Sequence, residues 1–431
     1  MDCGRKISGT AVKKICITHE INCNASDHPV ICGGANAMIK ILIAYPSMGI
    51  GGSTTSLLGL LQSLDYAKVQ IDLQLYENQG ALLQYIPKEV HLLPQARTFS
   101  ENPRIGKIQR LCYPQYWCAG IQAVLAQKKY PGTMAAAQIT AQARAKASRQ
   151  NTKQYDVAIG FLEMWSDAYV ATKIQADKKI AWIHIDYIKA GMVPKYDDGI
   201  LSCFDKIVLV SKECLNSFIS SFPRYSKKAI YIENILHQIV VKQRANEFKE
   251  RLLCSSDGIQ FGTVCRIEFR HKGLDRALRA FKKMREEGYN FDWHIIGEGS
   301  DRQKLENMIH DMDLDRNVHL YGSRINPLPL VKQFDCFILP SLYEGKPMAV
   351  TEALMLGIPA VVTRYASASE QIIPGENGII MDNSEEGILK GLRMILGERT
   401  YIGKWKSKLS EAAWDNNDIV RRLNSIIGVE E

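Results

Sequence analysis

A regular alternation of short apolar runs with longer amphipathic stretches limits the fold of this 431-residue chain more than any other feature. Ten of the runs are rich in Val, Ile and Leu and have the length of β-strands. They lie at 39–45, 69–75, 156–161, 179–185, 206–211, 259–266, 292–297, 317–322, 335–340 and 358–363. Continuously apolar strands that alternate with helices are typical of parallel sheets covered on both faces. The pattern therefore predicts an α/β fold with two doubly wound, Rossmann-like domains.

The two series of strands change over near residues 233–258. We therefore expect an N-terminal domain over residues 38–236 and a C-terminal domain over residues 237–431, whose terminal helices pack back towards the N-terminal domain. Residues 1–37 lack periodicity, and a strand, a glycine-rich loop and a helix follow from Met38. We expect this first segment to be a disordered extension or to precede the true start of the protein.

Composition narrows the class of protein. Hydrophobic residues make up 46% and charged residues 23%, as in ordinary globular domains. No apolar run reaches the roughly 18 residues of a membrane-spanning helix, and the first residues lack the apolar core of a secretory signal. The 11 cysteines are an odd number without Cys-x-x-Cys spacing, so we expect free thiols and no metal site. These features favour a cytoplasmic protein.

The net charge of +8 has a local source, a basic window over residues 97–153 that holds ten cations and one acid, Glu101. The cations are Arg97, Arg104, Lys107, Arg110, Lys128, Lys129, Arg144, Lys146, Arg149 and Lys153. Such a window suits an anionic partner, namely a membrane surface or a phosphorylated acceptor, and it equally suits a solvated helical face. Nucleic acid is disfavoured, because the window lacks the interleaved aromatic residues of a single-strand binder.

Ligands of doubly wound sheets bind beyond the carboxyl ends of the strands, so the loops at these ends hold the candidate site residues. The loop YPSMGIGGSTT places Gly51 and Gly52 before a helix and suits either a tight turn or a bound anion. In VCRIEFRHKG, Arg266 ends a strand and Lys272 opens the next helix, which suits a diphosphate clamp or ordinary surface charge. Gly297, in HIIGEGS, indicates a strand-to-helix turn, and a lone Gly-x-Gly is weak evidence for more.

The stretch SLYEGKPMAVTEALMLG holds two carboxylates just after an apolar run. Glu344 precedes Gly345 in a loop, and Glu352 lies about one turn inside a helix that begins near Pro347. A carboxylate accepts two hydroxyl hydrogen bonds, as sugar and ribose diols offer, whereas structural roles would have Glu344 cap the helix and Glu352 face solvent. The apolar neighbours of Glu352 favour a ligand. His184, in WIHID at another strand end, suits either a structural role or a site.

Together these stretches resemble the retaining glycosyltransferases of family 4, over residues 38–425. The most specific match is EGKPMAVTEAL, which resembles the family's motif of two glutamates with seven residues between them. VCRIEFRHKG resembles its Gly-Arg-Leu…Lys-Gly stretch, with Cys265 in place of the glycine and one residue more between Arg266 and Lys272. The resemblance implies the GT-B fold, in which two Rossmann-like domains face each other across a cleft.

The resemblance also implies a nucleotide-diphosphate sugar as donor substrate, with no cofactor and no metal. On this interpretation Arg266 and Lys272 hold the diphosphate, Gly51 and Gly52 lie against it, and Glu352 holds the ribose hydroxyls. These assignments would place the donor mainly on the C-terminal domain.

The donor sugar is assigned to a second group of residues on the same grounds. Glu344 and nearby backbone amides, such as that of Gly345, would hold the sugar, and Gly297 would belong to the family's Gly-x-Gly turn. His184 would lie beside the reaction centre. His184 and Glu344 are the catalytic candidates.

The implied activity is metal-independent transfer of a hexose to an acceptor hydroxyl with retention, in surface polysaccharide or glycan biosynthesis. The glycan or lipid-linked acceptor would lie on the N-terminal domain, and the protein would be cytoplasmic or peripheral at the inner membrane face. Two alternatives are a non-hydrolysing nucleotide-sugar epimerase of the GT-B type and a non-catalytic sugar-nucleotide-binding protein. The presence of Glu344, Glu352, Arg266 and Lys272 together argues against the second.

Overall fold

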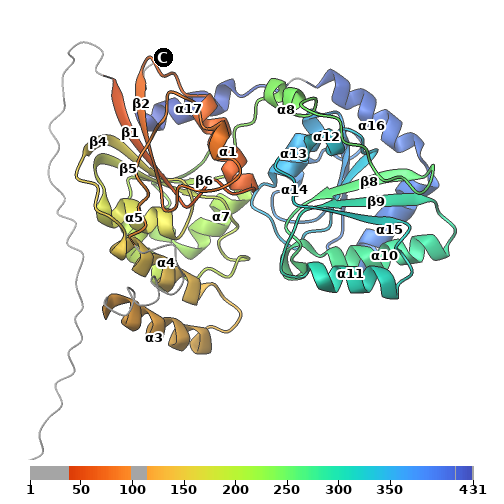
Figure 1. The fold of residues 1–431 in the computed structure, drawn as a ribbon, viewed down its shortest axis with the longest axis horizontal. Helices are drawn as coiled ribbons and strands as arrows, with labels where there is room; N and C mark the ends of the chain where they lie inside the picture. Colours follow the sequence, from red (N-terminus) through yellow and green to blue (C-terminus); the bar gives the residue numbers. More distant parts are fainter. Residues whose placement is uncertain (1–37, 99–113, 413, 430–431) are drawn as a thin grey trace, which may run out of the picture. The chain divides into compact units, whose positions relative to one another are not determined.

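The computed structural model describes residues 38–98, 114–412 and 414–429, all within one compact unit (Figure 1). The prediction for residues 1–37 lies outside the described residues, as do Glu101, Arg104, Lys107 and Arg110 of the basic window. Within the described residues, every helix is too short or too polar to cross a bilayer.

The first half of the chain builds a seven-stranded parallel sheet in the order β3-β2-β1-β4-β5-β6-β7. The strands are β1 (Ile39–Tyr45), β2 (Val69–Leu75), β3 (His91–Leu92), β4 (Gln154–Gly160), β5 (Gln175–Ile183), β6 (Lys206–Leu209) and β7 (Ala229–Tyr231). The strand order reverses between β1 and β4, and this reversal is where doubly wound sheets open to bind ligands.

Helices connect these strands (Figure 1). They are α1 (Gly52–Gln62), α3 (Pro114–Lys129), α4 (Ala135–Ala147), α5 (Trp165–Lys173), α6 (Pro194–Ser202) and α7 (Lys212–Ser221), with 3-10 turns η1 (Leu83–Tyr85) and η2 (Pro223–Tyr225). Tyr45, at the end of β1, accepts or donates hydrogen bonds with Ser53 at 2.7 Å and Thr54 at 3.1 Å, which ties the strand to the first turn of α1.

The second half builds a six-stranded parallel sheet in the order β10-β9-β8-β11-β12-β13. The strands are β8 (Ile259–Val264), β9 (Phe291–Ile296), β10 (Val318–Gly322), β11 (Cys336–Leu339), β12 (Ala360–Thr363) and β13 (Gly378–Met381). Its helices are α8 (Gln238–Arg244), α9 (Phe269–Lys272), α10 (Leu274–Glu286), α11 (Arg302–Asp311), α12 (Leu328–Val331), α13 (Met348–Met355), α14 (Ala368–Gln371), α15 (Glu385–Gly397), α16 (Thr400–Glu411) and α17 (Asn417–Ile427).

Burial along β11 shows why the central strands are continuously apolar. Cys336 and Ile338 belong to one core cluster, and Phe337 and Leu339 belong to another on the opposite face. Successive side chains of a strand point to opposite faces, so both faces of this sheet are covered. The prediction of two parallel, doubly wound sheets is confirmed, and the structure adds the short strands β3, β7 and β13 to the ten expected.

The last helix returns to the first sheet. Leu423, Ile426 and Ile427 of α17 are buried in the same core cluster as the strands of the first sheet. Lys178 of β5 donates a hydrogen bond to the carbonyl of Ile426 at 3.2 Å. Residues at the two ends of the described chain therefore share one core.

Candidate active site

Glu344 follows β11 at the carboxyl end of the second sheet and is the centre of a buried polar cluster. Lys272 Nζ lies 2.6 Å from Glu344 Oε1, and the Ser341 hydroxyl donates to the same oxygen at 2.5 Å. His271 Nε2 lies 3.6 Å from the other carboxylate oxygen. Burial alone would raise the pKa of Glu344, but Lys272 and His271 outweigh it and hold the pKa at about 2. The structure thus brings two predicted site residues, Lys272 and Glu344, into direct contact.

The local chain path around Lys272 differs from the expectation. The sequence indicated one helix opening at Lys272, whereas Lys272 ends the short helix α9 and Gly273 separates it from α10. Gly273 has a positive φ of 61°, a conformation that costs other residues more, and a Cβ there would lie 2.5 Å from the Pro340 carbonyl oxygen. This break, one residue after Lys272, lets α9 and the residue after β11 approach each other closely.

His271 fixes the same loop from the other side. Its ring stacks on Tyr343, with ring centroids 4.2 Å apart and planes 6° apart. His271 Nε2 also lies 2.9 Å from the Tyr343 carbonyl oxygen. The loop that carries Glu344 is therefore held by polar and stacking contacts from α9.

Glu352 lies in α13, where the sequence placed it, and is 9% exposed. Its carboxyl group receives no hydrogen bond from any of the residues that the structure describes. Burial raises the pKa of Glu352 to about 7, and the charge of Arg244 offsets only part of this rise. Buried carboxyl groups normally have partners, so an unpaired one at this sheet edge has the character of a ligand site.

Arg266 and the turn at Gly297 occupy a neighbouring loop region. Arg266 follows β8, is exposed, and makes no ion pair with a described residue, so its guanidinium is available to an anion. A Cβ on Gly297 would lie 1.9 Å from the Cys265 carbonyl oxygen, and the φ of Gly297 is 149°. Glycine is therefore required here for close passage of two chain segments, whatever else the turn binds.

The glycine loop of the first sheet reaches α13. Gly52 begins α1, and a Cβ on it would lie 3.3 Å from Met348 Cγ, in the first residue of α13. A Cβ on Gly51 would meet nothing within 4 Å, so Gly51 borders open space. The structure therefore brings the predicted glycine loop beside the helix that carries Glu352.

His184, just beyond β5, approaches the Glu344 loop through its backbone. A Cβ on Gly345 would lie 2.2 Å from the His184 carbonyl oxygen, so only glycine fits there. The His184 ring packs on Phe161 with centroids 4.8 Å apart, and its Nε2 is buried without a hydrogen-bond partner among the described residues. Burial lowers the pKa of His184 to about 3, which keeps the ring neutral at neutral pH.

Glu163, just after β4, is a candidate that the sequence interpretation missed. Its Oε2 accepts a hydrogen bond from the backbone N–H of His184 at 3.0 Å. Burial raises the pKa of Glu163 above its usual range. The signal was an acid two residues after the run DVAIGF, at the sheet's switch point.

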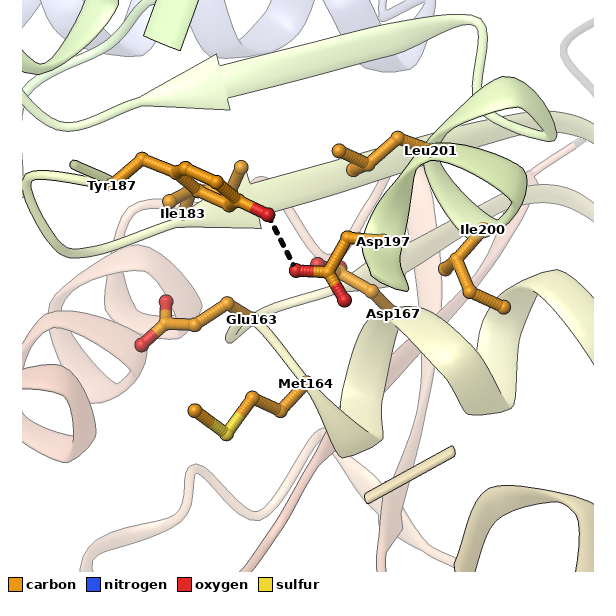
Figure 2. A pocket seen from close by; sticks show the side chains of 8 residues that line it. All are labelled: Glu163, Met164, Asp167, Ile183, Tyr187, Asp197, Ile200 and Leu201. Carbon is orange, nitrogen blue, oxygen red and sulfur yellow. Dashed lines mark hydrogen bonds between the residues drawn. The ribbon is translucent and has the colours of Figure 1, made fainter. Parts of the chain in front are cut away.

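Glu163 also lines a cavity of about 10 Å³ (Figure 2). Asp167 and Asp197 line it, and the Tyr187 hydroxyl donates to Asp197 at 2.8 Å. Figure 2 shows the Glu163 carboxyl group pointing away from these two acids. Burial raises the pKa of both, and one oxygen of Asp167 has no hydrogen-bond partner among the described residues. The volume suits at most a single water molecule.

A family model is similar to most of the second half of the chain. Residues 245–413 match the family model for glycosyl transferases group 1. This region carries the Glu344 cluster, Glu352, Arg266 and Gly297.

The matches to curated relatives cover only part of the length of each relative. An uncharacterised glycosyltransferase of Methanocaldococcus jannaschii is 28% identical over 211 residues, which are 47% of this chain and 52% of the relative. The O-antigen biosynthesis glycosyltransferase WclY of Escherichia coli is 26% identical over 182 residues, 41% of this chain and 50% of the relative. The chain thus spans about half the length of these curated relatives.

Solved structures match nearly the whole chain at low identity. Anabaena HepE in complex with UDP-glucose has a TM-score of 0.63 at 15% identity, covering 91% of this chain and 100% of that one. The lipopolysaccharide outer core galactosyltransferase WaaB has a TM-score of 0.56 at 14% identity, with coverages of 91% and 99%. At such identities the likeness shows the fold alone. Residues 245–413 thus match the model of the glycosyl transferases group 1 family, and the two-sheet fold resembles that of these solved structures.

Proposed function

We propose that this protein is a glycosyltransferase that moves a hexose from a nucleotide-diphosphate sugar to an acceptor hydroxyl, in the biosynthesis of a surface polysaccharide or related glycan. The observation that carries the proposal is the pair of carboxylates beyond β11. Glu344 is buried, ionised and held by Lys272, whereas Glu352 is buried and unpaired. Curated relatives named for O-antigen and capsular polysaccharide biosynthesis support the substrate class.

The donor lies over the carboxyl edge of the second sheet in this proposal. Glu352 accepts the two ribose hydroxyls, and Glu344, ionised at any physiological pH, accepts hydroxyls of the donor sugar. Arg266 and Lys272 stabilise the departing diphosphate by charge, so the reaction proceeds without a metal ion. HepE was solved with UDP-glucose, which supports a uridine nucleotide as the first donor to test.

Transfer takes place with retention in this proposal, as in family 4. The acceptor oxygen attacks the anomeric carbon from the face that the diphosphate leaves, and its proton passes to the departing phosphate oxygen. His184, which is neutral, and Glu163 both lie on the acceptor side. There Glu163 accepts a hydrogen bond from an acceptor hydroxyl. In this proposal residues 38–236 form the acceptor-side domain and residues 237–431 form the donor-side domain. A cleft separates the two.

The partner is an anionic surface at the cytoplasmic face of a membrane. Lys128, Lys129, Arg144, Lys146 and Arg149, members of the basic window within the described residues, are exposed. Their charge draws the protein to a leaflet that carries a lipid-linked glycan acceptor.

The test begins with binding. We expect one nucleotide sugar from a panel to raise the melting temperature of the wild-type protein, and UDP-sugars are the first class to try. The same donor is then incubated with and without lipid extracts that contain glycan acceptors. Release of nucleotide diphosphate with a glycosylated product supports the proposal. An epimerised nucleotide sugar formed without acceptor would instead assign the chain to the epimerase class, and binding without turnover would assign it to the binding proteins.

A further inference from the structure

Helix α3 (Pro114–Lys129) presents its large apolar side chains outwards. Trp117, Ile121, Val124 and Leu125 are 56%, 63%, 59% and 59% exposed, respectively. Their spacing places them along one face of the helix. Single exposed apolar residues are common, but four on one helical face form a patch of the kind that marks an interaction surface.

The inner face of α3 is built from small residues. Ala119 and Ala126 pack in a cluster with Ala135, Ile139 and Ala143 of α4, beside α3 (Figure 1). A surface helix normally points its large apolar residues into the protein. In α3 the alanines face the protein and the large apolar residues face outwards. This arrangement suits a helix whose outer face contacts an apolar environment outside the protein.

The charges on α3 and α4 indicate which environment this is. Neither helix contains an acid, and Lys128 and Lys129 close α3. Arg144 and Lys146 of α4 are exposed as well. An apolar face flanked by lysines is the pattern of helices that lie in the interface of an anionic membrane. Two copies of this chain meeting on the same face would instead bring cations together.

We infer that α3 inserts its apolar face into an anionic membrane surface, with Lys128 and Lys129 on the lipid headgroups. This inference rests on the proposed function, in which basic residues draw the protein to an anionic membrane. It adds that apolar side chains of α3 enter the membrane surface. The loop after α3 also leads to the donor site. Its Gly132 carbonyl accepts a hydrogen bond from Arg270, two residues from Lys272, so a lipid-linked acceptor would arrive beside the donor.

Vesicle flotation of the full chain tests the insertion. The wild type is mixed with phosphatidylcholine vesicles or with vesicles of equal parts phosphatidylcholine and phosphatidylglycerol, at low and high salt. We expect binding to the anionic vesicles that persists in part at high salt, because salt screens charge but strengthens apolar burial. The double variant Ile121→Gln with Leu125→Gln should bind at least about a hundredfold more weakly at either salt concentration, as expected from the loss of two buried apolar side chains.

Matched variants separate the causes. Ile239→Gln, at a residue of α8 that is 73% exposed, should float like the wild type. Lys128→Gln with Lys129→Gln should lose mainly the salt-sensitive part. Thermal stabilisation by the nucleotide sugar should be the same in the double variant and the wild type, so loss of flotation is distinct from loss of fold or of donor binding. Flotation that the double variant leaves unchanged, or a wild type that never floats, would overturn the insertion. A dimer that the double variant abolishes would assign the face to a second copy.

Discussion

Glu352 is a buried carboxyl group without a hydrogen-bond partner among the described residues, and this has a measurable pH signature. Its pKa is raised from 4.5 to about 7, so between these values the folded chain holds a proton that the unfolded chain has released. Stability therefore falls as pH rises through this window, by about 3 kcal/mol in total.

Glu352→Gln should remove that loss. We expect the variant to be as stable as the wild type at pH 4 and more stable at pH 8, because glutamine is neutral at both. Urea unfolding at the two pH values measures this. Transfer and donor-induced stabilisation should be lost, since the amide offers one acceptor oxygen to the two ribose hydroxyls where the carboxylate offers two, and its NH2 group can only donate. A variant with wild-type turnover would contradict the assignment of Glu352 to the ribose.

Arg266 and Lys272 share a proposed role but not a structural one. Arg266→Ala and Lys272→Ala should each lower kcat/KM by about 2–4 kcal/mol of transition-state stabilisation, as expected for loss of one donor to the departing charge. Only Lys272→Ala should also lower the melting temperature, because it leaves Glu344 buried without its ion-pair partner.

The pH dependence distinguishes the two variants further. The lowered pKa of Glu344 stabilises the fold above the unfolded value of 4.5, and this contribution fades as pH falls towards about 2. Arg266→Ala should keep that profile, and Lys272→Ala should flatten or invert it. Equal melting temperatures for the two variants at neutral pH would count against the Lys272–Glu344 contact.

At the scale of elements, the two sheets meet where the loop after β5 passes the loop after β11. Gly345→Ala places a methyl group within 2.2 Å of the His184 carbonyl oxygen, so one loop must move. We expect a cost of about 1–3 kcal/mol in stability and a larger proportional loss in turnover, because His184 and Glu344 are displaced relative to each other.

Gly49→Ala is the matched control, since a Cβ there meets nothing within 4 Å. Melting temperatures and steady-state kinetics of both variants provide the comparison. If Gly345→Ala behaved like Gly49→Ala, the close approach of the two loops would have no bearing on catalysis.

The sequence predicted the long elements well because their patterns are local. Leu274, Leu278, Phe281 and Met284 of α10 are buried as their spacing indicates. The short edge strand β3, with two residues, gives no periodicity to detect. Lys346 illustrates the limit at a site, because it ion-pairs with Glu233 at 2.6 Å and its neighbours in the sequence do not indicate this contact. Such contacts depend on segments more than 100 residues apart, which no local pattern encodes.

The candidate site was only partly visible for the same reason. The spacing of the sequence predicts that Glu344, Glu352 and Lys272 lie near the carboxyl ends of strands. The protonation states of the two glutamates could not be predicted, because the low pKa of Glu344 and the high pKa of Glu352 depend on which side chains contact them in the fold. Glu163 was missed because one acid after a strand is a weak signal without the neighbouring His184 backbone.

At the scale of the whole molecule, α17 is part of the first sheet's core. Leu423→Ala removes a fully buried side chain there and should cost about 2–5 kcal/mol. We expect thermal unfolding to begin at a lower temperature, with near-ultraviolet circular dichroism reporting the change. Arg421→Ala, on the exposed side of the same helix, should melt like the wild type. Equal effects of the two substitutions would mean that α17 is not part of this core.

The return of α17 also sets an order for biosynthesis. A ribosome makes the first sheet early, but the helix that completes its core follows β7 by nearly the whole second half of the chain. At roughly 5–20 residues per second, the unfinished first core waits on the order of ten seconds or more for its last helix. During that interval its apolar surface is open, so we expect the nascent first half to be prone to aggregation until α17 has been made.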